Sequence, residues 1–183
     1  MDGINGITAS YSFTVGLLLL LVNSKISFID HNLIIYSLIG VLVFGFFNFR
    51  NNAKTFAGDV GSVSIAYILL FCLGLLIIKT GNYIYILFLT IYGIDSVWTI
   101  LRRLKLREAH RSHLYQYLAN EAKFNKLLIS FLYGLIQLIV GLLVIWISNF
   151  DVKFQLYFSI ILLVIVSVIY LIIKNFVIKN YLV

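Results

Sequence analysis

The chain of 183 residues contains no proline, a single cysteine and few charged side chains. Without proline, no helix is forced to kink by a pyrrolidine ring. Cys72 has no second cysteine to pair with, so an internal disulfide is excluded and packing is its expected role. Charged residues make up 11% of the chain, against roughly 25% in a soluble domain. Because 62% of the residues are hydrophobic, the composition predicts an integral membrane protein.

Six apolar stretches are long enough to cross about 30 Å of hydrocarbon as helices. They lie at 7–23, 32–49, 62–79, 82–101, 126–148 and 154–174. The first is the weakest of the six, because it is short and carries four hydroxyl side chains, at Thr8, Ser10, Ser12 and Thr14. The predicted fold is all-α: a polytopic transmembrane bundle of about six spans that forms a single domain over 1–183.

The charges between the spans predict the orientation of the chain. If the N-terminus is cytoplasmic, all fourteen lysines and arginines face the cytoplasm except Lys25, Lys79 and Lys153. This bias follows the positive-inside rule and places both termini in the cytoplasm. The basic residues cluster in loops as membrane topology requires, so the net charge of +7 does not indicate a nucleic-acid partner.

An acidic residue between two glycines precedes the third apolar stretch, in the sequence FAGDVGS at residues 56–62. Glycine lets a backbone approach a ligand closely, and a helix start offers free N–H groups to an anion. Asp59 could hold a Mg²⁺ ion that bridges to phosphate oxygens. The alternative is a helix N-cap that follows a flexible turn.

Two further segments combine small and polar residues at predicted cytoplasmic boundaries. Asp2 and Asn5 lie in the sequence MDGINGI at residues 1–7, which is either part of a ligand pocket or a frayed terminus. Asn48, Asn51 and Asn52 lie close to Lys54. These asparagines either bind a sugar or nucleotide or only cap the end of a helix.

A strongly basic stretch follows the fourth span and contains His110, Arg111 and His113. Imidazoles and cations near a membrane surface suit a polyanionic substrate such as a diphosphate, although a positive-inside anchor with a surface helix explains most such stretches. No carboxylate cluster or cysteine completes a zinc site there. Asp95 lies inside the fourth span, where a carboxylate marks a functional site or pairs with an Arg or hydroxyl of a neighbouring helix.

Four segments, in this order, resemble the polyprenyl-phosphate N-acetylhexosamine-1-phosphate transferases of glycosyl transferase family 4. Residues 2–6 resemble the family's Asp-Gly-x-Asn/Asp-Gly motif, and residues 53–62 its Ala-Lys-x-Phe-x-Gly-Asp-x-Gly-Ser motif. Residues 95–103 resemble its Asp-x(6)-Arg-Arg helix end, and residues 110–113 its last, His-rich motif. The likeness extends over the whole chain but covers only the C-terminal half of the family's usual length.

The resemblance implies a reaction and a set of site residues. A sugar 1-phosphate, with N-acetylglucosamine as the expected sugar, would pass from a UDP-sugar to undecaprenyl phosphate with release of UMP, which initiates cell-envelope glycan synthesis. Asp59 would be the ligand of Mg²⁺, or of Mn²⁺, and would act in catalysis with His110 and His113. The substrate-binding residues would be Asp2, Asn5, Asn52, Lys54, Phe56 as a stacking partner of uracil, Arg102, Arg103 and Arg111.

The resemblance also implies a bacterial inner membrane as the location, with membrane lipid, the UDP-sugar and polyprenyl phosphate as partners. Two departures from the family are visible. Ser112 replaces the middle His of the last motif, and the family's paired aspartates would lie upstream of Asp2. We therefore expect the chain alone to be weakly active or inactive, and to need its missing N-terminal half or a dimer partner. A non-catalytic membrane partner that retains the scaffold, and a small transporter that uses Asp95, are the alternatives.

Overall fold

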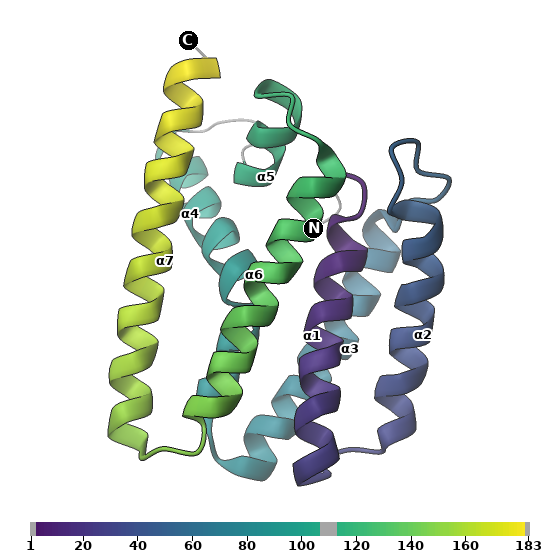
Figure 1. The fold of residues 1–183 in the computed structure, drawn as a ribbon, viewed down its shortest axis with the longest axis vertical. Helices are drawn as coiled ribbons and strands as arrows, with labels where there is room; N and C mark the ends of the chain where they lie inside the picture. Colours follow the sequence, from purple (N-terminus) through teal and green to yellow (C-terminus); the bar gives the residue numbers. More distant parts are fainter. Residues whose placement is uncertain (1–2, 107–112, 182–183) are drawn as a thin grey trace.

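The computed structural model describes residues 3–106 and 113–181. Within these ranges the chain forms helices and no strand, and six of the helical segments are long and apolar enough to cross a membrane. They stand side by side as an elongated bundle (Figure 1). The predicted all-α polytopic bundle with six spans is confirmed.

For most of the helix ends, the predicted and observed positions differ by only a few residues. Asp30 and Asn125 explain where two of them begin, because each side chain accepts a hydrogen bond from the backbone N–H two residues ahead. The third helix begins four residues before its predicted start and therefore includes Asp59 in its first turn. The elements are α1 (Ile7–Ile26), α2 (His31–Asn48), α3 (Gly58–Thr80), η1 (Tyr83–Leu89), α4 (Thr90–Leu106), α5 (Leu114–Gln116), η2 (Tyr117–Glu121), α6 (Lys126–Ile147) and α7 (Val152–Tyr181).

The helix α1, predicted to be the weakest span, is the most buried of the six. It packs against α2, α3 and α6, and its hydroxyl side chains at Thr8, Ser12 and Thr14 are turned inside the bundle. Gly141 of α6 lets the two helices approach closely, since a Cβ atom there would overlap the side chain of Leu18. The polar residues of α1 therefore reflect its central position rather than a poor fit to the membrane.

The fourth span is interrupted although it contains no proline. The buried side chain of Gln137, from α6, accepts a hydrogen bond from the backbone N–H of Ile91 at 2.9 Å and donates one to the carbonyl oxygen of Leu87 at 3.2 Å. In an unbroken α-helix these two backbone groups would bond to each other. Gln137 therefore stands between them and marks the change from η1 to α4, a recognised cause of bends in helices.

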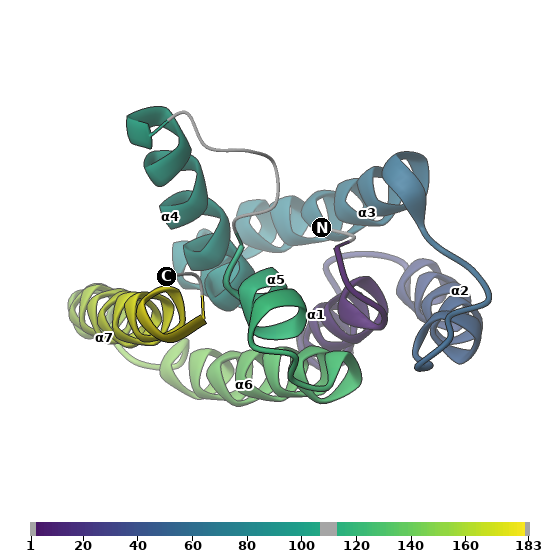
Figure 2. The ribbon, with the colours of Figure 1, turned by 90° about the horizontal axis from the view of Figure 1, so that it is seen from above.

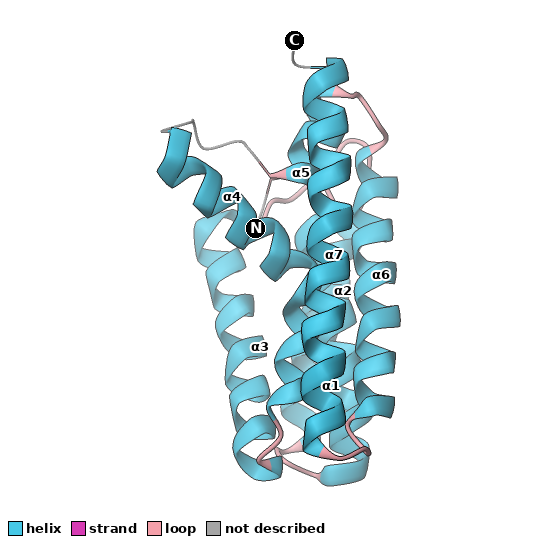
Figure 3. Ribbon diagram, turned by 90° about the vertical axis from the view of Figure 1, so that its left-hand side faces the viewer, coloured by secondary structure: helices cyan, strands magenta, loops and turns pink. Residues whose placement is uncertain are grey.

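The helices α4 and α7 form one side of the bundle. Beyond the break, α4 leans away from the other helices (Figure 3), while α7 contacts α4, η1 and η2. Only 6% of the span in α7 is buried, so most of its apolar surface is available to lipid. The few buried positions of α7 include two polar residues near its C-terminal end, Tyr170 and Lys174.

Candidate functional site

One end of the bundle gathers the described parts of the predicted motifs. The turn before α1, the loop between α2 and α3, and α5 all lie at the upper end in Figure 1. Seen from above, α5 lies among α1, α4, α6 and α7 (Figure 2). Segments that are far apart in the sequence therefore meet around the start of α1.

Asn48, at the end of α2, connects the turn before α1 to the loop that follows α2. Its side-chain oxygen accepts a hydrogen bond from the backbone N–H of Gly6 at 2.8 Å, and its side-chain nitrogen donates one to the carbonyl of Thr55 at 2.7 Å. Gly6 has a φ of 84°, and a Cβ atom there would lie 2.5 Å from the ring of Phe49. Only glycine fits this turn without strain.

Asn5, predicted to bind substrate, makes a second connection between the same segments. Its side-chain nitrogen donates to the carbonyl oxygens of Arg50 and Asn51 at 2.9 and 3.0 Å. The hydroxyl of Ser130, on α6, donates to the Asn5 carbonyl at 2.8 Å. In this structure the amide donors of Asn5 therefore hold two motifs together.

The other predicted residues of the loop face solvent. Asn52, Lys54 and Phe56 are exposed, and so is Asp59 in the first turn of α3. Within residues 3–106 and 113–181, no side chain is seen to pair with the Asp59 carboxylate. This end of α3 thus presents an aromatic ring, a cation and a carboxylate within a few residues of one another.

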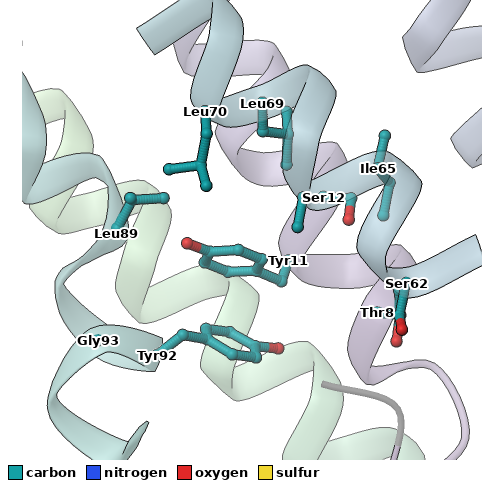
Figure 4. A pocket seen from close by; sticks show the side chains of 11 residues that line it. Thr8, Tyr11, Ser12, Ser62, Ile65, Leu69, Leu70, Leu89, Tyr92 and Gly93 are labelled. Atoms are coloured by element: carbon teal, nitrogen blue, oxygen red, sulfur yellow. The ribbon is translucent and has the colours of Figure 1, made fainter. Parts of the chain in front are cut away.

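An apolar groove lies next to this surface, between α1, α3 and the fourth span. It has a volume of about 220 Å³, and Thr8, Ser62, Tyr11 and Tyr92 are among its lining residues (Figure 4). The two tyrosine ring centroids are 3.8 Å apart. A second groove, of about 460 Å³, is lined by α1, α2 and α3 and includes Phe56. Hydrocarbon chains are the ligands that such linings accommodate.

His113 lies just before α5 and contacts the carboxylate of Asp95. The distance from His113 Nδ1 to Asp95 Oδ1 is 3.4 Å, which is within ion-pairing range, although the two atoms are not aligned for a hydrogen bond. The backbone N–H of Leu114 donates to the same oxygen at 3.1 Å. Hydroxyls of Tyr133 on α6 and Tyr170 on α7 also donate to the carboxylate, at 3.3 and 3.0 Å. Of the two roles left open for Asp95, the structure supports pairing across helices.

The remaining predicted residues do not join the loop that follows α2 in the described structure. Arg102 and Arg103 are half-buried in the last turns of α4, the helix that leans away from α5 (Figures 2 and 3). Asp2, His110 and Arg111 lie outside the described residues.

Among the residues that the structure describes, no group of three or more His, Cys, Asp or Glu side chains could hold a metal ion. Mg²⁺ is commonly held by one or two carboxylates, with water and substrate phosphates supplying the other ligands. Asp59, with an exposed carboxylate, fits the part of one such ligand.

Sequence reasoning did not identify two of the residues that shape this end of the bundle. Tyr115 of α5 stacks on His113, with ring centroids 5.2 Å apart and planes at 16°, and it stands next to Gly3. Lys174 is buried in α7. A signal for Lys174 was present, since Tyr170 and Lys174 are spaced i, i+4 and thus share one face of an otherwise apolar helix.

Comparison with known proteins gives one match. Residues 1–81 match the family model described as glycosyl transferase family 4, which confirms the family predicted from the motifs over that part of the chain. Residues 82–183 lie outside the match. No curated protein and no solved structure matches the chain.

Proposed function

Residues 1–81 match glycosyl transferase family 4, a family of membrane sugar-phosphate transferases. We propose that this chain takes part in the transfer of a sugar 1-phosphate, with N-acetylglucosamine as the expected sugar, from a UDP-sugar to undecaprenyl phosphate. The reaction releases UMP. The multi-pass bundle then lies in a bacterial inner membrane with both termini in the cytoplasm.

The observation that carries the proposal is the junction of two motifs above an apolar groove. Asn5 and Asn48 bond the turn before α1 to the loop that carries Lys54 and Phe56, and Asp59 follows at the start of α3. The groove begins beside Ser62, one turn further along α3 (Figure 4). A polar surface next to an apolar groove suits a lipid phosphate, whose head is charged and whose chain is hydrocarbon.

The chemistry is a phosphoryl transfer. An oxygen of the lipid phosphate attacks the phosphorus that bears the sugar, a new diphosphate bond forms, and the bond to the UMP oxygen breaks. Mg²⁺ bound with Asp59 would offset negative charge on the migrating phosphate. Phe56 stacks on the uracil ring, Lys54 binds phosphate oxygens, and His113 stands at the same end of the bundle to contact the diphosphate.

The test compares two matched substitutions, Asp59→Asn and Asp151→Asn. Asp151 is an exposed carboxylate in the turn before α7, at the opposite end of the bundle, and an asparagine there keeps an oxygen for the Phe154 N–H. Transfer from sugar-labelled UDP-N-acetylglucosamine to undecaprenyl phosphate is measured in membranes of the source cell, where any polypeptide that completes the site is present. Asp59→Asn should lower the rate about a hundredfold or more, because several kcal/mol of charge stabilisation are lost.

The control substitution Asp151→Asn should keep the rate of the unchanged chain. Equal rates for the two variants, with both present in the membrane at the same level, would contradict the assigned role of Asp59. Absence of chain-dependent transfer from any UDP-sugar would instead favour a non-catalytic membrane partner that retains the transferase scaffold.

A further inference from the structure

Lys174 is a buried cation within a helix that mostly faces outward. Its exposed fraction is 3%, whereas only 6% of the span in α7 is buried. A charged side chain buried in a protein is costly unless polar partners surround it, so its partners call for an explanation. Neither the predicted motifs nor the family match over residues 1–81 includes α7.

The ammonium group of Lys174 is connected to His113 through two intermediate residues. Lys174 Nζ donates to the hydroxyl of Tyr170 at 2.7 Å, and this hydroxyl donates to Asp95 Oδ1 at 3.0 Å. The same carboxylate oxygen lies 3.4 Å from His113 Nδ1. A side contact supports the chain, since Lys174 Nζ also lies 3.3 Å from the hydroxyl of Thr99, which in turn donates to Asp95.

Asp95 controls the position of His113 in two ways. It accepts the N–H of Leu114, which fixes the backbone directly after the histidine, and it lies against the imidazole ring. A carboxylate that is 1% exposed needs a nearby cation to offset its charge. Lys174 places a cation next to the Tyr170 hydroxyl that donates to this carboxylate, and hydrogen bonds in such a chain strengthen one another in a low-dielectric interior.

We propose that Lys174 and Tyr170 are positioning residues for His113, so that α7 takes part in shaping the site without reaching it. Through the Asp95 carboxylate, they keep the imidazole stacked on Tyr115 at the end of the bundle where the transfer is assigned. The expected effect on the transfer rate rests on the proposed function. The link from Lys174 and Tyr170 to the position of His113 does not depend on it.

The experiment uses Tyr170→Phe, Lys174→Met and, as a matched control, Lys179→Met. Lys179 is on the same helix and is exposed, so its replacement removes the same charge without a buried contact. The chain has only three histidines, so their ring ¹H–¹³C NMR signals can be resolved in detergent micelles. The signal that disappears in His113→Gln identifies the ring stacked on Tyr115.

Tyr170→Phe and Lys174→Met should each shift the His113 signal and leave the His31 signal in place. His31 begins α2 at the other end of the bundle, beside Asn23, and therefore reports on whether the fold is intact. Lys179→Met should move neither signal. In the transfer assay the first two variants should lower kcat by about 10- to 100-fold, as expected when a reacting group is displaced, while KM for the UDP-sugar changes far less.

An unchanged His113 signal in Tyr170→Phe, with His31 also unchanged, would overturn the proposal. Tyr170→Phe loses one oxygen atom and keeps the lysine, so it decides the question even if Lys174→Met does not fold. A shifted His113 signal in a chain that supports no transfer would leave the positional link standing and count against the proposed function alone.

Discussion

The hydrogen bonds of Asn48 give a prediction whose size follows from the structure. Asn48→Ala removes the acceptor of the Gly6 N–H and the donor to the Thr55 carbonyl, at a side chain that is 1% exposed. A buried backbone group left without a partner costs about 1–3 kcal/mol. For two such groups, with some relaxation of the loop, we expect the free energy of local opening at this end of the bundle to fall by about 2–4 kcal/mol.

Hydrogen exchange at the Gly6 amide measures this loss directly. Because every 1.4 kcal/mol is a factor of ten, the amide should exchange about 30 to 1,000 times faster in Asn48→Ala. Asn32→Ala is the matched control, since it makes the same change at an exposed position of the same helix. It should leave the Gly6 exchange rate as it is. If exchange in Asn48→Ala rose by less than about threefold, water would have replaced the lost side chain at little cost, and the reasoning would be refuted.

Two further predictions concern thermal unfolding in a single detergent. Gln137→Leu should destabilise the chain by about 2–4 kcal/mol, because the Ile91 N–H and the Leu87 carbonyl lose their buried partner. An unchanged melting temperature would mean that these two backbone groups bond to each other and that the helix becomes continuous. Gly141→Ala should cost about 1–3 kcal/mol, since its methyl group would overlap a leucine of α1. Gly74→Ala, where nothing lies within 4 Å of the added carbon, should be neutral or slightly stabilising, and equal effects of the two alanines would contradict the close packing of α1 on α6.

The spans could be predicted because each one is a local property of the sequence. Apolar length set the six helices, and side chains such as Asp30 and Asn125 set where α2 and α6 begin. The same local reasoning ranked α1 as the weakest span, because a hydroxyl counts against a helix that faces lipid. Its central place in the bundle depends on contacts with α2 and α6, which no single stretch of sequence reveals.

The candidate site could be predicted only in part for the same reason. The motifs around Asn5 and Asp59 were found as patterns, but not the bonds that join Asn5 to carbonyl groups 45 and 46 residues away. Two hydroxyl partners of Asp95 come from α6 and α7, up to 75 residues further along the chain. The relative rotation of helices decides such pairs, and hydropathy alone carries little information about it.

Because α7 crosses the membrane and contacts the residues around Asp95, the thickness of the bilayer can affect the site. The apolar part of α7, residues 154–174, spans about 31 Å at 1.5 Å per residue, which matches about 30 Å of hydrocarbon, while the helix itself runs from Val152 to Tyr181. In a thinner bilayer this apolar part would exceed the hydrocarbon thickness, and the helix would tilt further. That movement would carry Lys174 along with α7, while its bond to Tyr170 and the bond of Tyr170 to Asp95 oppose the shift. A change in the length of the surrounding lipid chains would therefore act, through α7, on the carboxylate that lies against His113.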